Sequence, residues 1–285
     1  MVIDDNAELR QFHEFKPSGR GFYSPRVGGR IKMPTVSEIK VVLQDVKDFA
    51  DPLLEMYRQD ERVSVQKLVA SCEKRLKVQQ QQLEKYQEMC RYENHYKAQG
   101  YQLIAGIDEA GRGPLSGPVV AGAVILSEGF LLPGLNDSKQ LSEQRREEFF
   151  AYIEQHALAY SVGIVSAEEI DQINIYEATK LAMFRAIQGL KVQPDFLLID
   201  AMKLQTEMPG LSLIKGDTLS ISIAAASVVA KVTRDRMMKE YALKYPEYGF
   251  EKHMGYGTKE HLAAIQQFGP TPIHRMTFAP MQNIK

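Results

Sequence analysis

The sequence predicts an α/β protein in which a five-stranded mixed sheet is flanked by helices, with further helical regions at both ends of the chain. Two patterns support this class. Long stretches have apolar residues at helical spacing, and between them lie short apolar runs that end in turn residues or acids. The five runs expected to form strands are 103–107, 119–126, 158–165, 196–201 and 208–214.

The first two strands are joined by a turn with many glycines. Residues Tyr101 to Leu126 read YQLIAGIDEAGRGPLSGPVVAGAVIL. Glycine and proline at this density require a tight backbone path, so we expect a hairpin. Asp108 follows the first apolar run, where an ionised carboxylate costs several kcal/mol unless it is paired or bound to a metal.

Two interpretations of Asp108 stay open on the residues alone. An acid at a strand end can simply bond to its own turn. The neighbouring Glu109 and the Gly-Arg-Gly that follows favour a site for a metal or phosphate, since glycines let backbone N–H groups approach a ligand and arginine adds donors. Adjacent strand residues point to opposite faces, so the pair shares one metal only if the strand ends or twists there.

Two more acids repeat this placement. Asp200 follows the run FLLI, and Asp217 follows the run that ends near Ile214. If these strands are neighbours, their terminal acids meet at one edge of the sheet and can share a cation. For Asp217, an acid in a glycine turn is the plain alternative.

Helices are expected between and after the strands. Ser142 is a predicted N-cap, Ser166 precedes a short helical turn, and a helix over Asn174 to Gln188 ends at Gly189. A long Ala- and Val-rich helix begins at Ser220 or Ser222, and another covers 259–267. On the long helix we expect Asp235 to form a surface salt bridge rather than bind metal.

The N-terminal part of the chain divides into two predicted regions. Residues 1–32 are rich in Gly, Pro and Ser and predict a flexible extension. Met33 is an alternative start, and the sequence leaves both interpretations open. The pattern over residues 33–98 predicts a small helical module. This module either has a role in packing or solubility or adds a nucleic-acid contact through Lys67, Lys74, Arg75 and Lys77. The catalytic domain is expected over residues 99–285.

Composition limits the class of protein. The chain is 44% hydrophobic and 25% charged, as in ordinary globular proteins. It has no apolar run long enough for a membrane span and no basic-then-apolar leader, so we expect a cytoplasmic protein with reduced Cys72 and Cys90. Because the net charge is only −1, any nucleic-acid contact must use a local basic patch. Residues 231–285 are one candidate, since they carry nine Lys/Arg against five Asp/Glu. An ordinary solvated surface explains this excess equally well.

The run GIDEAGRGPLSGPVV resembles the signature of ribonuclease HII, the type 2 ribonuclease H. The resemblance continues to Pro280 through DSKQL, LLIDAM, KGD, SIAAASVVAKVTRDR, YGFEKHMGYGTKEH and HRMTFAP. It implies a ribonuclease H-like fold and a metal-dependent endoribonuclease. Such an enzyme cuts the RNA strand of RNA–DNA hybrids and nicks DNA 5′ of embedded ribonucleotides. We expect it to be a cytoplasmic monomer. Ser116 stands where many relatives have Ala.

The resemblance also implies the site. Its four acids become metal ligands and catalytic carboxylates, holding two Mg²⁺ or Mn²⁺ ions, which suits an oxygen-only donor set. In such a site the glycine turn recognises the ribose 2′-OH and the DSK loop binds a phosphate. One tyrosine stacks on the deoxyribose that follows the RNA–DNA junction. The residues concerned are Asp108, Glu109, Asp200 and Asp217 for the metal, and Gly111, Arg112, Gly113, Ser138, Lys139 and Tyr256 for the substrate.

Two other functions remain as alternatives. A type 3 ribonuclease H would prefer long hybrids, although the Arg-Gly of the turn is not expected there. A non-catalytic protein that binds hybrids is disfavoured because four clustered acids would repel a polyanion. Dinucleotide binding is poorly supported, since Asp and Pro occupy the turn where a phosphate-binding loop should open into a helix.

Overall fold

The computed structural model describes residues 33–279 and 281–283, and the predicted extension over 1–32 lies outside them. The chain separates into two compact units, one up to Val78 and one from Gln79 onward. The boundary falls within helix α3 (Val63–Met89).

The regular structure in the described part of the first unit, residues 33–78, is helical, as its apolar spacing predicts. It contains α1 (Val36–Asp45), α2 (Pro52–Arg58) and the first half of α3. Ile39, Leu43, Leu54 and Val65 are among the buried residues of its own small core. Arg75, one of the residues considered for nucleic-acid contact, donates hydrogen bonds to the carbonyls of Leu43 and Val46 and so supports the packing of α1.

The second unit is built on a five-stranded sheet in the order β3-β2-β1-β4-β5. β1 pairs antiparallel with β2, and β2 with β3, whereas β1–β4 and β4–β5 are parallel. The prediction of a mixed sheet is therefore confirmed. The strands are β1 (Ile104–Ala110), β2 (Val119–Leu126), β3 (Ala157–Val165), β4 (Phe196–Asp200) and β5 (Gly210–Leu213).

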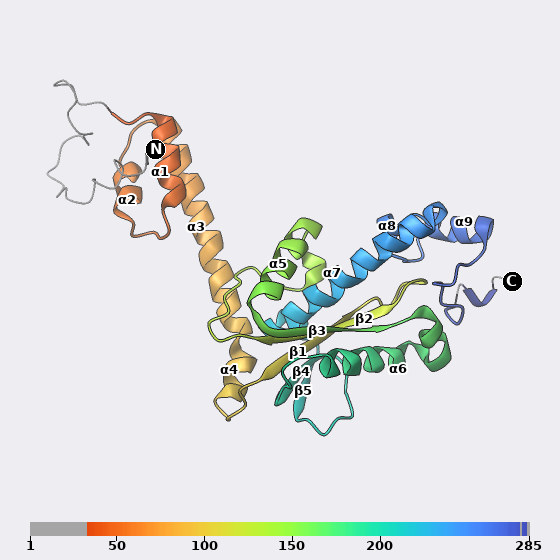
Figure 1. Cartoon of the computed structure of the whole chain (residues 1–285). Coiled ribbons are helices and arrows are strands. Elements are labelled where there is room, and N and C mark those ends of the chain that lie inside the picture. The colour runs from red at the N-terminus through yellow and green to blue at the C-terminus, as the bar shows by residue number, and fades with distance from the viewer. Residues whose placement is uncertain (1–32, 280, 284–285) are drawn as a thin grey trace, which may run out of the picture. The chain divides into compact units, whose positions relative to one another are not determined.

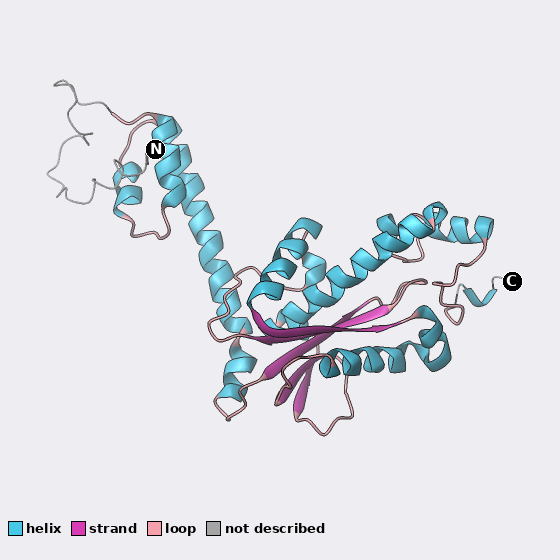
Figure 2. Ribbon diagram, viewed as in Figure 1, coloured by secondary structure: helices cyan, strands magenta, loops and turns pink. Residues whose placement is uncertain are grey.

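Helices cover both faces of this sheet (Figures 1 and 2). α7 (Ile221–Lys244) and α5 (Glu143–His156) pack on one face, and α6 (Ala167–Gln188) packs on the other. The apolar residues of β1 alternate accordingly, since Ala105 and Ile107 join the α6 side while Ile104 lies on the α7 side. The result is a three-layer α/β/α arrangement.

Glycine lets α7 come very close to the sheet. A Cβ at Gly106 would lie 2.0 Å from the backbone carbon of Ser222, and one at Gly122 would lie 2.5 Å from the carbonyl oxygen of Ala226. The Ala-rich start of α7 is fully buried against these strands. Small side chains on both surfaces are thus what brings the N-terminal half of α7 alongside β1.

Most predicted helix starts are confirmed. The side chains of Ser142, Ser166 and Ser220 each accept a backbone N–H at the start of α5, α6 and α7. α6 is broken at Asn174, where φ is 66°, and the side chain of Asn174 caps the segment that follows.

Two expectations need correction. β1 continues to Ala110, so the acidic pair lies within the strand and not at its end. Asp235 does form ion pairs, with Lys231 at 2.6 Å and Arg146 at 3.6 Å, but it is buried between α7 and α5 rather than on a helix surface.

The C-terminal region after α7 is helical and turn-rich. Two short helices, α8 (Phe250–His253) and α9 (Lys259–Phe268), pack with the end of α7 around Phe250 and Ile265. The segment then returns to the glycine turn, where Gly117 donates to the carbonyl of Ile273. Within the described residues, no helix combines the length and apolar character needed to cross a bilayer.

The close approach of α7 and β1 can be tested by Gly106→Ala. The added Cβ meets backbone rather than a side chain that can move, so we expect a loss of at least about 3 kcal/mol in the free energy of unfolding, measured in urea. Gly129→Ala is the control, because a Cβ there meets open space and costs only about 1 kcal/mol through its positive φ of 72°. Equal losses in the two variants would contradict this account of the packing.

Candidate active site

Asp108 and Asp200 lie side by side on neighbouring strands. Ile107 is level with Ile199 in the parallel pairing of β1 and β4, so the next residues on each strand are the two acids. Asp108 and Asp200 occupy strand positions whose side chains face α7, where the hydroxyl of Ser227 acts to lower the pKa of Asp108. Strand register therefore brings together two acids that are far apart in the sequence.

Asp217 joins them through a short turn after β5. The 3₁₀ turn η3 (Gly216–Thr218) begins after Lys215, which has a left-handed backbone, and the N–H of Gly216 donates to Oδ1 of Asp200 at 2.6 Å. This bond ties the turn that carries Asp217 to the end of β4. The predicted grouping of Asp217 with Asp200 is thus present in the backbone.

Glu109, the next residue on the same strand, is partly buried. Arg112 approaches its Oε1 at 3.4 Å, whereas its Oε2 is buried and has no hydrogen-bond partner among the described residues. A buried carboxylate oxygen without a donor is costly. Oε2 of Glu109 is therefore available to a cation.

Burial and mutual repulsion shift the titration of these acids. Burial raises the pKa of Asp108 well above its ordinary value, and the carboxylates of Glu109 and Asp200 raise it further. Burial also raises the pKa of Glu109 and of Asp200. For Asp217, burial and then Asp137 and Asp200 raise the pKa to about 6.

Lys139 is the cation that faces this group. Burial alone would lower its pKa, but Asp108, Asp137 and Asp217 raise it overall. Ser138, predicted to touch phosphate, is buried, and its hydroxyl pairs with that of Ser227 at 2.9 Å. Any phosphate contact at Ser138 would therefore use its backbone.

The donor set fits a hard divalent cation. All four acids offer oxygen, no Cys or His is involved, and one buried oxygen of Glu109 has no partner. Among residues 33–279 and 281–283, however, no three His, Cys, Asp or Glu side chains are grouped closely enough to hold a metal ion. The assignment of Asp108, Glu109, Asp200 and Asp217 as metal ligands stays a prediction.

Tyr256 lies beside the glycine turn. A Cβ at Gly113 would be 3.5 Å from Cε1 of Tyr256, and the tyrosine is 50% exposed. Tyr248, the nearby alternative, is buried in the C-terminal core and stacks on Phe250. Of the two tyrosines, only Tyr256 has a ring open to a ligand at this turn.

Histidines hold the Tyr256 segment in place. His261 Nδ1 bonds to the carbonyl of Tyr256, and its Nε2 faces Nε2 of His274 at 3.0 Å. Burial lowers the pKa of both His261 and His274 to about 4, so the pair is neutral at pH 7.

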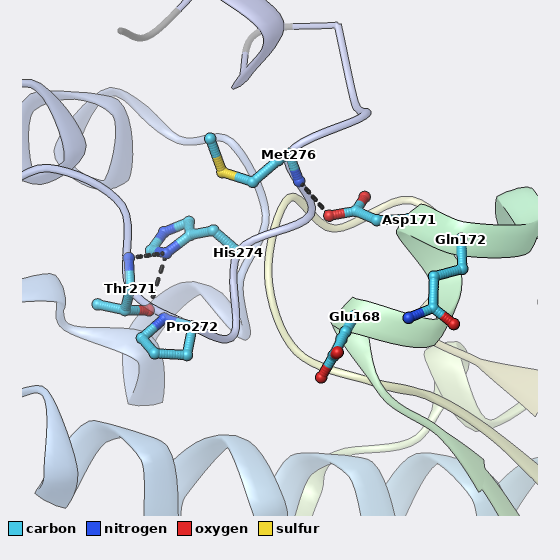
Figure 3. A pocket seen from close by; sticks show the side chains of 7 residues that line it. All are labelled: Glu168, Asp171, Gln172, Thr271, Pro272, His274 and Met276. Atoms are coloured by element: carbon cyan, nitrogen blue, oxygen red, sulfur yellow. Dashed lines mark hydrogen bonds between the residues drawn. The ribbon is translucent and has the colours of Figure 1, made fainter.

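Four residues at this site have no role that the sequence patterns predict. Asp137 and Ser227 contact the acids, and two buried arginines, Arg234 and Arg275, contact the glycine turn. Asp137, Ser227 and Arg275 lie in the runs DSKQL, SIAAASVV and HRMTFAP, yet no local pattern distinguishes their side chains. An open pocket elsewhere, between α6 and the C-terminal segment, contains none of the four acids (Figure 3).

A mixed sheet with flanking helices, an acid on each of two central parallel strands and a glycine turn directly after one of them define the class of ribonuclease H-like α/β hydrolases. Family models agree with this class. The model described as ribonuclease HII matches residues 105–281, and that of the ribonuclease HII N-terminal domain matches residues 35–97. The chain belongs to the ribonuclease HII family.

Curated relatives and solved structures agree. Ribonuclease HII of Bacillus licheniformis is 56% identical over 252 residues, 88% of this chain and 99% of that protein, and ribonuclease HII of Bacillus mycoides is 54% identical over 88% and 97%. Ribonuclease H2 of Pyrococcus horikoshii superposes with a TM-score of 0.56 at 29% identity, covering 64% of this chain and 96% of the other. The chain is thus an endoribonuclease that hydrolyses phosphodiester bonds of RNA in RNA–DNA hybrids.

Repulsion among the acids predicts that Asp108→Asn stabilises the metal-free protein. The folded state raises the pKa of Asp108 above its unfolded value, so at pH 7, above the unfolded pKa, this carboxyl group opposes folding and a neutral amide does not. We expect the free energy of unfolding in chelator to rise by roughly 1–2 kcal/mol.

Asp235→Asn is the matched control, since Asp235 is buried to a similar extent but lies between two cations. That variant should lose about 3 kcal/mol. A loss of stability in Asp108→Asn as well would show that the acids are not in mutual repulsion.

Proposed function

We propose that this enzyme nicks duplex DNA on the 5′ side of an embedded ribonucleotide, with Mg²⁺ or Mn²⁺ held by Asp108, Glu109, Asp200 and Asp217. The observation that carries the proposal is the position of Tyr256 beside Gly113, at the end of the strand that bears Asp108. The aromatic ring of Tyr256 thus lies against the amides of the turn, and that turn directly follows the strand that carries two of the acids.

Metal binding is supported by the charge state of the site. The acids raise one another's pKa, and Lys139 is the lysine whose pKa they raise. Divalent cations, when bound, would supply an activated water and stabilise the leaving oxygen. The chain's own acids would then position the ions and remove the need for a protein nucleophile.

Ribose recognition is supported by the glycine turn. Gly111 has φ of 95°, which favours glycine, and Gly113 has no side chain between its backbone and Tyr256. Backbone N–H groups of the turn can therefore meet a 2′-hydroxyl directly, and contact with this hydroxyl is how a protein distinguishes RNA from DNA at one sugar. Arg112 is 41% exposed at its side chain and can reach a neighbouring phosphate.

The wider setting is part of the same proposal. We expect a monomeric enzyme that acts in the cytoplasm on ribonucleotides left in DNA and so contributes to their excision repair. The division into an extension over 1–32, a helical module over 33–98 and a catalytic domain over 99–285 also stays a proposal; the compact units divide at Val78, and the matched N-terminal family domain ends at residue 97.

Asp108→Asn should abolish nicking of a duplex that contains one ribonucleotide. The amide removes the negative charge that a cation needs, so we expect a loss of at least ~10²-fold in the single-turnover rate with Mg²⁺ or Mn²⁺, while duplex binding survives. Asp235→Asn, on α7 and away from the predicted ligand set, should retain the rate per folded molecule. Near-normal turnover of Asp108→Asn would refute the metal assignment, and binding without cleavage by the wild type would favour a non-catalytic hybrid-binding protein.

Tyr256→Ala should weaken cleavage of a single embedded ribonucleotide more than cleavage of a long RNA–DNA hybrid. Stacking of an aromatic ring on a nucleotide contributes about 1–3 kcal/mol, so we expect roughly a tenfold loss on the single-ribonucleotide duplex. Tyr256→Phe keeps the ring and should behave like the wild type. Equal loss on both substrates would remove Tyr256 from junction recognition, and a wild type that prefers the long hybrid would favour the type 3 alternative.

A further inference from the structure

Two arginines are buried under the glycine turn without an acidic partner. Arg234 is 1% exposed and Arg275 is 0% exposed. Within the described part of the chain, neither forms a salt bridge at 4.0 Å or less. Burial lowers the pKa of Arg275 to about 9 and that of Arg234 to about 10, which reflects the cost of placing a charge there. Buried charges of this kind are retained only where their hydrogen bonds are satisfied.

The bonds of Arg275 go to backbone carbonyls of the turn. Its guanidinium donates to the carbonyls of Gly111 and Arg112 and, through two nitrogens, to that of Gly117, at 2.5 to 3.0 Å. Arg234 takes a different set, donating to the carbonyls of Ser116, Pro118 and Met254. Arg275 is thus the arginine that donates to the part of the turn predicted to meet the ribose, whereas Arg234 packs against Gly111 without donating to its carbonyl.

These contacts give the turn a polarity. The carbonyls of Gly111 and Arg112 point to the buried guanidinium, while the N–H groups of Arg112 and Gly113 donate to no acceptor in the described residues. Successive free N–H groups form a concavity that accepts oxygen atoms. The charge beneath the turn fixes the carbonyls inward and so keeps these N–H groups available.

Arg275 is itself held by its neighbours. Asp171 in the second turn of α6 accepts a hydrogen bond from the N–H of Met276 at 2.7 Å (Figure 3). It also accepts one from the N–H of Thr277 at 3.0 Å, so it holds the two residues after the arginine. The N–H of Arg275 bonds to the carbonyl of Leu115 within the turn, and its guanidinium lies 5.0 Å from the ring of Phe278. The position of the guanidinium relative to the turn is therefore fixed from both sides.

We propose that Arg275 is a positioning residue for sugar discrimination, which orients the amides of the glycine turn toward the ribose 2′-hydroxyl. The inference rests on the proposed function of the turn. Lysine cannot replace this residue, because its single ammonium group lacks the planar fork that reaches three carbonyls at once.

The test compares binding of two duplexes that differ in one sugar. Arg275→Lys, Arg234→Lys and the unmodified residues are each placed in the Asp108→Asn background so that no cleavage occurs. The dissociation constant is measured for a duplex with one ribonucleotide and for the same duplex made only of DNA. A purely structural role of Arg275 would reduce the amount of folded protein. Such a loss leaves the ratio of the two dissociation constants unchanged.

We expect Arg275→Lys to reduce the preference for the ribonucleotide duplex by about tenfold, a size typical of a small misplacement of binding groups. Arg234→Lys, equally buried and packed against Gly111 but bonded to other carbonyls, should lose clearly less of the preference. An unchanged preference in Arg275→Lys would overturn the inference. If the Asp108→Asn protein with both arginines already shows no preference, the proposed reading of ribose by the turn fails instead.

Asp171→Asn provides a second variant if Arg275→Lys does not fold. It leaves the guanidinium in place, weakens the bonds that hold the residues after it and removes a negative charge that favours the charged arginine. We expect an intermediate loss of preference, and retention of the full preference in this variant would count against the inference.

Discussion

The repulsion among carboxylates in a poorly solvated part of the molecule is the constraint on which the site depends. Asp108 is buried beside Asp200, and the pKa of each is raised by burial. Such an arrangement opposes folding unless the surrounding backbone fixes it. Strand pairing of β1 with β4 and the Gly216 N–H on Asp200 provide that fixation, so the chain spends folding stability to keep negative charge in one place.

Close packing of α7 makes this possible. Glycines in β1 and β2 admit the helix backbone, and Ser227 then lies where it can donate to Asp108. The same helix carries Asp235, which is neutralised by Lys231 and Arg146, and Arg234, which reaches the glycine turn. α7 thus supports both the acids and the glycine turn. The charge of Asp235 is paired within the protein, whereas the charge of Asp108 and Asp200 is left for cations.

Much of this could be predicted from the sequence, and the failures have physical reasons. Apolar runs and N-cap serines gave all five strands and the starts of the main helices, because these features act locally. The end of β1 was misplaced, since pairing with β2 through Ala110 overrides the polar Asp-Glu signal. Asp235 was expected at a surface because its partner Arg146 lies on another helix, about ninety residues away. The metal role of the four acids rested on resemblance and stays a prediction.

Arg275 illustrates why side-chain roles are harder to predict than elements. In the sequence it follows a histidine in a turn-rich segment, where an arginine is ordinarily exposed. Its burial follows from a backbone path that returns to the glycine turn more than 150 residues later, at the contacts of Leu115 with Arg275 and of Gly117 with Ile273. Opposite charges are thereby placed on either side of one short stretch: carboxylates on β1 and guanidiniums under the turn that follows it. A polyanion cannot approach four acids unaided, so a site of this kind needs cations on the acids and oriented donors beside them, and this chain has the residues to provide both.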